Sequence, residues 1–567
     1  MEFILKKRYL CFPVKSGAPL CRTRLLLPGY HVHVDLELTD GQPDFWVYFD
    51  AYYDLGKGIQ IVSESGSPLH AGDLAVLSDR PVGDELLYRE ERRPLYHFTT
   101  ARGWINDPNG LVYKNGEYHM FYQLNSFGCR GFDKGWGHAK SKNLFDWEIL
   151  PPALYADETG YAISGSALFD TDNRAGFGRD AWILAYSSRF GDAPERGQAQ
   201  NIAYSTDGRT FHKYGKNPVI EDYACPDFRD PKVFWHEPSG HFVMAVTFGA
   251  VLRFYTSGNL KQWTMASELE ADDFRSEGKI KECPELMEYQ IEGEEGTRWV
   301  LTLSYTNDRR VQHIIGDFDG RTFTWDRETE PRYADYGKDY YAAVAWNPFG
   351  EMAGRKLYIG WMCYWEYALQ CTNREGWMGA FTVPREHYLR RHGDGKLYIH
   401  QAPARELASL MQEGREIPRI MIPPEQNYKT GFYEACELSF TLKQENTRSG
   451  YTGFQLCYQS GEAIDFNIDF VNSILVVDRS RCGGQHLGEA YQEKLTVPVS
   501  NIAKMDIRLL IDKGCFELFI EDGLSCMAAI CFPGVYTGNI LFYNKCGEEY
   551  EVSKLAVRPI RRAQWKY

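Results

Sequence analysis

A two-part pattern repeats along the middle of this chain and restricts its fold more than any other feature. Each copy begins with a β-rich run, at 118–123, 181–187, 241–248, 298–305 and 356–363. In four copies a polar turn follows and ends at an aromatic residue, Trp147, Phe211, Trp263 or Phe323, whereas the fifth copy has FTVPR at 381–385. Successive copies lie about 50 to 65 residues apart, the length of one four-stranded propeller blade. The spacing therefore predicts a five-bladed β-propeller over residues 92–395, with a pair of β-sandwiches as the alternative.

The composition agrees with an all-β chain. Aromatic residues make up 15% of the 567 residues, and there are 52 glycines, which suits many short strands and turns. Short alternating strands at 454–458, 464–470, 507–511 and 515–520 predict a C-terminal β-sandwich over 396–567. Residues 1–91 form a predicted β-rich accessory module, which would brace the propeller, mediate dimerisation or bind sugar. Its aromatic residues are explained equally well as core or as a sugar platform; they are Phe45, Trp46, Tyr48, Tyr52 and Tyr53.

Charge and cysteine usage exclude several classes of protein. The formal net charge of −14 argues against nucleic-acid binding, which requires a basic face. No run of eighteen apolar residues occurs, so we expect no membrane-spanning helix. The N-terminus has no apolar stretch typical of a signal peptide, which predicts a cytoplasmic protein, or a secreted one if a leader has been removed. The 14 cysteines show no Cys-x-x-Cys pair or zinc-site spacing, so we expect buried reduced thiols and no metal or other cofactor.

A further strand candidate precedes each β-rich run, and each one carries unusual polar residues. These segments are NDPNG at 106–110, SGS at 164–166, RDP at 229–231, ECP at 282–284 and DYY at 339–341. The first strand of every propeller blade lines the central channel, so five distant segments would meet at one concave mouth where ligands bind.

Proline marks the positions of three acids in this set. Asp107 and Asp230 directly precede a proline, and Glu282 lies two residues before one. Proline favours extended geometry in the residue before it and is tolerated mainly where a strand starts. We therefore expect three carboxylates at matching places on three blades. Convergent acids suit glycoside hydrolysis or metal binding, but no EF-hand-like spacing supports calcium.

The chemistry of a retaining glycosidase assigns different protonation states to such acids. Two carboxyl groups about 5–5.5 Å apart act as nucleophile and as acid/base, and the acid needs a raised pKa from burial or neighbouring negative charge. A third carboxylate can stabilise positive charge on the sugar. We expect the adjacent Arg229 to keep Asp230 ionised.

The motifs resemble those of one known family. WINDPNG at 104–110 resembles the WMNDPNG signature of glycoside hydrolase family 32, the β-fructofuranosidases, and FRDP at 228–231 and ECP at 282–284 match two further motifs in the family's order. Weaker matches occur at 136–139, 164–167, 339–342, 359–362 and 382–386. The resemblance covers about residues 95–390 and implies a β-sandwich packed on a propeller.

The resemblance implies roles for single residues. Asp107 would be the nucleophile that forms a covalent fructosyl-enzyme at C2, Glu282 the general acid and then base, and Asp230 the transition-state stabiliser. The substrate-binding positions would be Asn106, Gln123, Trp136, Ser164, Arg229, Asp339 and Trp361. The implied reaction releases terminal β-D-fructofuranosyl units from sucrose or from levan- or inulin-type fructans, so the expected partner is a small carbohydrate, and a homo-oligomer is possible. The alternatives are a fructosyltransferase on the same intermediate, a non-catalytic carbohydrate-binding propeller and an inverting furanosidase.

The chain also departs from the family pattern. Ile105 replaces a methionine, Ile163 replaces a phenylalanine, and Gly131 stands where the family often has tryptophan. We predict that Phe132 takes over part of that missing contact. Cys283 either tunes the neighbouring acid or is a buried thiol, and His138 is expected to be structural.

Overall fold

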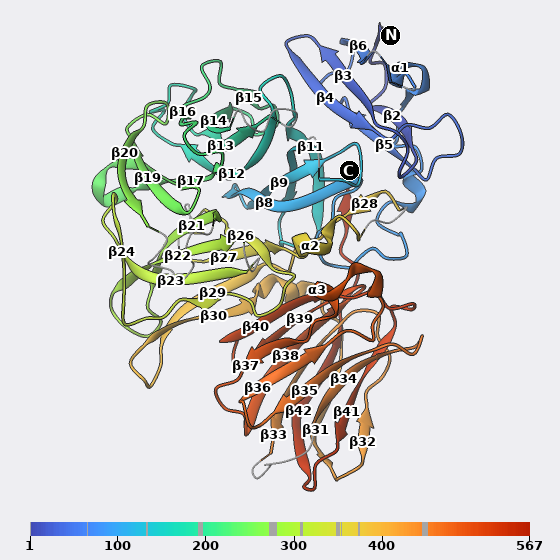
Figure 1. Ribbon diagram of the computed structural model, residues 1–567, viewed down its shortest axis with the longest axis vertical. Helices are drawn as coiled ribbons and strands as arrows, with labels where there is room; N and C mark the ends of the chain where they lie inside the picture. The colour runs from blue at the N-terminus through green and yellow to red at the C-terminus, as the bar shows by residue number, and fades with distance from the viewer. Residues whose placement is uncertain are drawn as a thin grey trace.

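The computed structural model describes residues 2–64, 66–67, 69–131, 134–190, 197–270, 280–306, 310–347, 352, 354–371, 375–444 and 452–567. This part of the chain is almost entirely β-structure (Figure 1). Its α-helices are single turns: α1 (Ala71–Leu74), α2 (Trp365–Ala368) and α3 (Glu489–Gln492). None of its helices is long and apolar enough to cross a membrane.

Five successive antiparallel arrays of strands fill the middle of the described chain. The first contains β8 (Gly103–Lys114), β9 (Glu117–Asn125), β10 (Gly135–Ser141) and β11 (Trp147–Leu154), and the second contains β12 (Tyr161–Asp170), β13 (Ala181–Arg189), β14 (Gln198–Ser205), β15 (His212–Lys213) and β16 (Ile220–Glu221). The third contains β17 (Phe228–His236), β18 (His241–Phe248), β19 (Val251–Ser257) and β20 (Thr264–Leu269). The fourth contains β21 (Lys281–Gln290), β22 (Thr297–Tyr305), β23 (Val311–Phe318), β24 (Phe323–Trp325) and β25 (Arg332–Tyr333). The fifth contains β26 (Tyr341–Ala345), β27 (Leu357–Trp361), β29 (Arg385–Arg391) and β30 (Leu397–Pro403).

The first strands of the five sheets contact one another in a closed circuit. β8 contacts β12, β12 contacts β17, β17 contacts β21, β21 contacts β26, and β26 returns to β8. The β-rich runs of the sequence repeat are the second strands β9, β13, β18, β22 and β27. Segments far apart in the chain are thereby gathered around one axis.

Each of these first strands carries a β-bulge at its polar segment. The register shifts lie between Ile105 and Pro108, Ile163 and Gly165, Arg229 and Lys232, Glu282 and Glu285, and Tyr341 and Val344. A bulge leaves one residue unpaired and re-aims its side chain. The bulges therefore turn the functional residues out of the ladder at the same level in all five sheets.

One expectation drawn from proline was wrong. Asp230-Pro231 lies inside β17 rather than before its start, and Asp230 has a φ of 66° instead of extended geometry. Cys283 and Ala342, at the corresponding bulges, also have positive φ, 48° and 50°. The requirements of the bulge outweigh the local bias of proline, because the pairing with β18 and the hydrogen bonds of Asp230 to Ser187 and Cys283 hold the backbone there.

Two six-stranded sheets form the C-terminal β-sandwich, at the bottom of Figure 1. One contains β31 (Arg415–Ile422), β33 (Cys436–Lys443), β38 (Lys504–Asp512), β39 (Cys515–Ile520), β40 (Ser525–Ile530) and β42 (Tyr550–Pro559). The other contains β32 (Asn427–Lys429), β34 (Thr452–Tyr458), β35 (Ala463–Asp469), β36 (Ile474–Asp478), β37 (Leu495–Pro498) and β41 (Gly538–Asn544). Their inner faces bury a continuous apolar core that includes Phe454, Phe466 and Phe542.

The predicted boundary at 395 falls inside the fifth sheet, because β30 pairs with β29 up to Pro403. The chain also returns to the first sheet at its C-terminus, where β43 (Trp565–Lys566) pairs with β11. On the other edge of that sheet, β28 (Trp377–Met378) pairs with β8. The first sheet is thus completed by segments from elsewhere in the chain.

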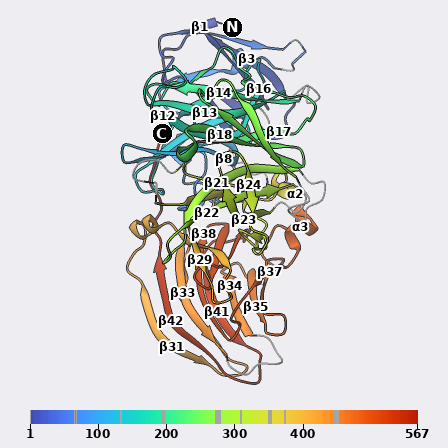
Figure 2. The ribbon, with the colours of Figure 1, turned by 90° about the vertical axis from the view of Figure 1, so that its left-hand side faces the viewer.

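The N-terminal module consists of two small sheets at the opposite end of the molecule from the sandwich (Figure 2). They contain β1 (Glu2–Ile4), β3 (Cys21–Leu27), β4 (Tyr30–Leu36) and β6 (Gly58–Ser63), and β2 (Tyr9–Val14), β5 (Phe45–Asp50) and β7 (Val76–Ser78). Phe45 is buried and would meet a Cβ placed at Gly376, whereas Tyr52 is 51% exposed. The aromatic residues of this module are therefore divided between core and surface.

Candidate active site

The three predicted acids come together around the circuit of first strands. A narrow cavity of about 20 Å³ is lined by all five of these strands, through Pro108, Ser164, Asp230, Cys283 and Val344. Asp107 interacts electrostatically with Glu282, and Asp230 interacts with both of them. Residues 107, 230 and 282 of the sequence thus form one cluster of negative charge.

Asp107 is held by hydrogen bonds to both carboxylate oxygens. Ser164 Oγ donates to Oδ2 at 2.6 Å, and Asn106 Nδ2 donates to Oδ1 at 2.8 Å. Asn106 is oriented in turn by Trp104 Nε1, which donates to its Oδ1 at 2.9 Å. Burial raises the pKa of Asp107, and the Lys134 ammonium and these two hydrogen bonds oppose that rise. Asp107 is half-buried, as a group that must reach a substrate requires.

Glu282 receives a donor on each oxygen. Arg229 approaches Oε1 with Nε at 3.2 Å and with a terminal nitrogen at 2.9 Å, and Tyr341 donates its hydroxyl to Oε2. The other terminal nitrogen of Arg229 bonds Asp227. The Glu282 side chain remains 18% exposed, so it is oriented by these donors and is still reached by solvent.

Asp230 is the most buried of the three acids, at 5% exposure. Its Oδ2 accepts the backbone N–H of Cys283 at 3.0 Å, and its own N–H donates to Ser187 Oγ at 3.0 Å. Burial and the charges of Glu282 and Asp107 raise the pKa of Asp230 to about 7, against the attraction of Arg229. The expectation that Arg229 keeps Asp230 ionised is therefore wrong at mildly acidic pH, because Arg229 lies 3.9 Å from Asp230 and is shared with Glu282 and Asp227.

Cys283 is a buried thiol. Its Sγ lies 3.7 Å from Asp230 Oδ2, and burial together with the surrounding acids raises its pKa well above the usual value. The thiol therefore stays protonated and contacts Asp230. All fourteen cysteines are free, and all but Cys225 and Cys457 are buried.

Asp339 lies elsewhere, contrary to its predicted role in substrate binding. It is fully buried; its Oδ1 accepts the Tyr367 hydroxyl at 2.5 Å, and its Oδ2 accepts Arg479 at 2.6 Å and the Ile530 N–H at 2.9 Å. Both oxygens of Asp339 are therefore occupied. Since Arg479 and Ile530 belong to the sandwich, Asp339 joins the start of the fifth sheet to that domain. The residue of this motif that reaches the acids is Tyr341, which the sequence analysis did not select, although it occupies the bulge position of the repeat.

The remaining predicted positions lie close to these groups. Gln123 Nε2 and Trp136 Nε1 donate to the carbonyls of Ala162 and Ile163, both at 3.1 Å, and so support the strand that carries Ser164. Trp361 packs against Trp104 and Trp365 with ring centroids 6.0 Å and 4.7 Å away. The prediction for Phe132 lies outside the described residues. Lys134, beside Asp107, was not selected from the sequence because it belongs to no motif.

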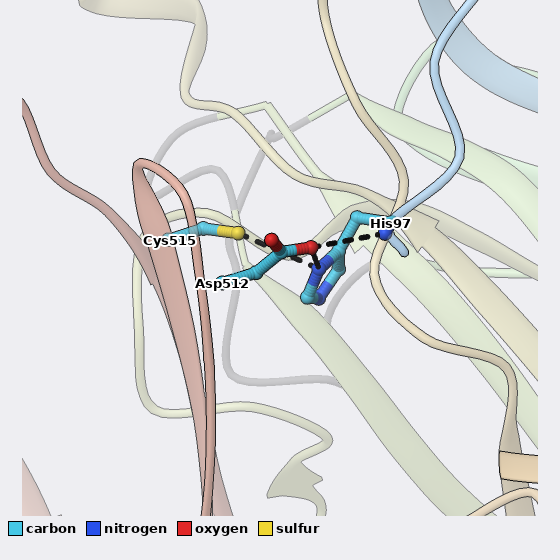
Figure 3. Close-up of side chains that lie close together, drawn as sticks. All are labelled: His97, Asp512 and Cys515. Atoms are coloured by element: carbon cyan, nitrogen blue, oxygen red, sulfur yellow. Dashed lines mark hydrogen bonds and ion pairs between the residues drawn. The ribbon is translucent and has the colours of Figure 1, made fainter. Parts of the chain in front are cut away.

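One cluster outside the site has the composition of a metal centre. His97, Asp512 and Cys515 present ligand atoms within 4.8 Å of one another (Figure 3). His97 Nδ1 lies 2.9 Å from Asp512 Oδ2, and its Nε2 lies 3.1 Å from Glu517 Oε1. Asp512 also accepts the backbone N–H groups of 95, 96, 97 and 513 at 2.7–3.2 Å.

In this cluster His97 forms ion pairs with Asp512 and Glu517. Burial alone lowers the pKa of an imidazole, but Cys515, Asp512 and Glu517 raise the pKa of His97 well above its usual value. Both nitrogens of the imidazole face carboxylate oxygens in this arrangement. The cluster therefore joins the segment before β8 to the β38–β39 hairpin of the sandwich.

His138, the other histidine singled out in the sequence, is buried in an aromatic setting. Its Nε2 lies 3.0 Å from His119 Nδ1, and its ring stacks on Phe121 with centroids 4.2 Å apart. Burial lowers its pKa well below the usual value, so it is neutral and structural.

Most of the chain is similar to known proteins. Residues 97–402 match the family model for the glycosyl hydrolases family 32 N-terminal domain, and residues 406–559 match that for the family's C-terminal domain. A levanase of Bacillus subtilis (strain 168) is 36% identical over 495 residues, which cover 84% of this chain and 72% of the levanase. An extracellular exo-inulinase of Aspergillus awamori is 31% identical over 494 residues, covering 79% and 90% of the two chains.

Solved structures also superpose on most of this chain. The crystal structure of the Aspergillus awamori exo-inulinase superposes with a TM-score of 0.75 at 27% identity, covering 84% of this chain and 99% of that one. A β-fructofuranosidase of Schwanniomyces occidentalis complexed with fructosyl-erythritol superposes with a TM-score of 0.76 at 26% identity, with the same coverage. The matched residues include Asp107, Asp230 and Glu282, and the chain belongs to glycosyl hydrolases family 32.

Proposed function

We propose that the protein is a retaining β-fructofuranosidase that releases terminal β-D-fructofuranosyl units from sucrose or from levan- or inulin-type oligosaccharides. The observation that carries this proposal is the convergence of Asp107, Asp230 and Glu282 from three first strands, each in a different set of hydrogen bonds. Relatives described as levanase, exo-inulinase and invertase support the substrate class.

The three acids have separate tasks in this proposal. Asp107, with both oxygens held by Ser164 and Asn106, attacks C2 of the fructosyl unit as the leaving oxygen takes a proton from Glu282. A covalent fructosyl-enzyme results, and water deprotonated by Glu282 then attacks C2 and releases Asp107. Asp230 stabilises the positive charge that develops on the ring. Two displacements at C2 give retention of configuration.

The polar atoms around the acids would bind the sugar hydroxyls. Arg229 and Tyr341 orient Glu282, and Arg229 reaches Gln198 as well. Gln123 Oε1 and Trp361 Nε1 are buried and have no hydrogen-bond partner within the described part of the chain, so both keep a capacity for a substrate hydroxyl. We further propose that the closed circuit of five sheets is a five-bladed β-propeller with this pocket at one mouth of its channel.

We also propose a cytoplasmic location for the protein. The fourteen free thiols support a reducing compartment, where disulfides are rare. Short imported oligosaccharides or sucrose would then be the available substrates.

The purified protein, incubated separately with sucrose, levan, inulin and sucrose phosphate, tests the proposal. We expect free fructose, released first as the β-anomer, which NMR at early times detects. An α-anomer would show inversion, fructose transferred to sugar in excess of free fructose would show a transferase, and no product from any substrate would show a non-catalytic propeller. Each of these results would contradict the proposal.

Two variants separate the roles of the acids. Asp107→Asn should lower kcat by at least about 10³-fold with an unchanged circular dichroism spectrum, because the nucleophile is lost. Glu282→Gln should impair sucrose far more than an aryl fructoside with an acidic leaving group, because the latter needs little protonation. A mild effect of the first, or an equal loss on both substrates for the second, would remove the assigned role.

A further inference from the structure

Lys134 lies at the end of the first sheet that holds the proposed nucleophile. It immediately precedes β10, whose first residue Gly135 pairs with Leu124, and Leu124 pairs with Ile105 on β8. The carbonyl of Lys134 accepts the N–H of Ala162 at 2.9 Å, two residues before Ser164. The backbone at Lys134 is therefore bonded to β12, which carries Ser164, and it lies next to β9, the strand that pairs with β8.

Aromatic contacts hold the Lys134 side chain. Its Nζ lies 5.1 Å from the ring centroid of Trp365, within the range of a cation–π interaction. Trp365 packs on Trp104, the residue that orients Asn106, with centroids 6.3 Å apart. A Cβ placed at Gly131 would lie 3.7 Å from Lys134 Cε and 3.5 Å from Trp104 Cε2. The methylene chain of Lys134 and the indole of Trp104 therefore lie close to the same point of the backbone.

The ammonium group faces the catalytic acids. Burial lowers the pKa of Lys134, the charges of Asp107, Glu282 and Asp230 oppose that fall, and one cation, Arg189 at the end of β13, adds to it. Among the charged groups that act on Asp107, Lys134 is the strongest influence favouring the carboxylate, and Glu282 opposes it. Lys134 forms no salt bridge with a carboxylate in the part of the chain that the structure describes.

We propose that Lys134 is a positioning residue that maintains Asp107 as a carboxylate ready to attack. This inference rests on the proposed function, because it assigns Lys134 a task only if Asp107 is the nucleophile. A buried carboxyl beside two other acids tends to bind a proton, and a protonated carboxyl is a poor nucleophile. The ammonium opposes this tendency without forming a direct ion pair that would block the attacking oxygen.

The same charge assists the second half of the reaction. When water attacks C2, Asp107 leaves as a carboxylate, and a nearby cation stabilises the charge that reappears on it. Lys134 thus favours the ionised carboxylate before attack and after release.

Lys134→Met tests this proposal, because methionine keeps the length and the aromatic packing of the side chain and removes its charge. We expect the acidic limb of the kcat/KM profile to move to higher pH by about one unit. At a pH below the limb, this shift is about a tenfold loss of kcat/KM relative to the wild type. Lys134→Arg should restore the wild-type limb, since it restores the charge.

Lys114→Met is the matched control. Lys114, on β8 of the same sheet, also lies over an aromatic ring, 4.5 Å from the centroid of Phe169, but it donates to the carbonyl of Asp180 and not to the acids. Its removal should leave the pH profile unchanged. Thermal unfolding of all variants shows whether Lys134→Met is folded, and if it is not, the position of the limb in Lys134→Arg and Lys134→Gln decides the question.

The possible outcomes separate a failure of this inference from a failure of the proposed function. A wild-type protein that releases no fructose would overturn the proposed function. A functional wild type whose acidic limb is identical in all Lys134 variants would overturn the role of Lys134 alone. A raised KM with an unchanged limb would also overturn it, because Lys134 would then bind substrate instead.

Discussion

At the scale of the residue, the three acids differ because their surroundings differ. Asp107 and Glu282 are partly exposed and each receives donors on both oxygens, whereas Asp230 is almost fully buried and has its pKa raised to about 7. Arg229 divides its guanidinium among several acids and so determines the protonation of none by itself. Two cations, Arg229 and Lys134, near three carboxylates still leave an excess of negative charge in a largely buried place, which is costly for folding.

Asp230→Asn should therefore stabilise the fold at alkaline pH. The pKa of about 7 in the folded protein lies above the usual aspartate pKa of 3.8, so the stabilising contribution of the neutral group is fully present below pH 3.8 and is lost as the pH rises from 3.8 through 7. Asparagine is always neutral and keeps an oxygen for the Cys283 N–H. We expect its melting temperature to equal that of the wild type below about pH 4, to exceed it increasingly between pH 4 and 7, and to be higher by about 2–5 °C at pH 8. Differential scanning calorimetry across this range measures the effect, and a difference independent of pH would contradict it.

At the scale of the element, the bulges in the first strands determine where functional side chains point. Ser164 reaches Asp107 at 2.6 Å because the β12–β13 register shifts beside it, between Ile163 and Gly165. Gly165 is required there, since a Cβ at this position would lie 2.0 Å from the carbonyl oxygen of Ala185. The glycine thus permits the close strand approach that positions the serine.

Gly165→Ala should displace β12 from β13 and weaken the Ser164–Asp107 hydrogen bond. We expect a loss of about 1–3 kcal/mol in the free energy of unfolding, as for other overpacked sites. We also expect at least about a tenfold fall in kcat/KM, because about 1.4 kcal/mol of lost transition-state stabilisation is tenfold in rate.

Gly215→Ala is the control for this change. Gly215 lies between β15 and β16 of the same sheet, and a Cβ there would meet nothing within 4 Å. We expect it to change stability by no more than about 0.5 kcal/mol. Urea unfolding and initial rates on sucrose compare the two variants, and equal effects would show that close packing at Gly165 is unimportant.

At the scale of the whole molecule, buried charged residues join the C-terminal sandwich to the closed circuit of five sheets. His97 lies between Asp512 and Glu517, Glu517 also binds Arg385 at 2.6 Å, and Arg479 binds Asp339 at 2.6 Å. These groups are nearly all inaccessible to solvent, so each depends on its partners to compensate for the loss of water. Fully satisfied networks of this kind fix one relative placement of two domains.

Asp512→Asn should destabilise the protein without a direct effect on the acids. The amide retains one acceptor oxygen where the carboxylate serves His97 and four backbone N–H groups, so buried donors are left unpaired. We expect the free energy of unfolding to fall by about 3 kcal/mol, which a lowered melting temperature would show. For the wild type, we expect that a chelator leaves the activity unchanged. Asp469→Asn, at a surface turn where Asp469 accepts two backbone N–H groups, is the control and should have little effect. A chelator effect reversed by a divalent cation would show that the cluster binds metal.

The sequence by itself determined which strands form and which acids come together. The repeat placed the second strand of every sheet, and the motifs selected Asp107, Asp230 and Glu282, because hydrogen-bonded strands and reactive carboxylates require particular residue types at fixed spacings. Only the tertiary structure decided that Tyr341 rather than Asp339 meets Glu282, that Asp230 is in a left-handed conformation, and that the charge of Lys134 acts on Asp107. Bulges, burial and long-range charge depend on which strands become neighbours, and no local pattern of residues specifies that.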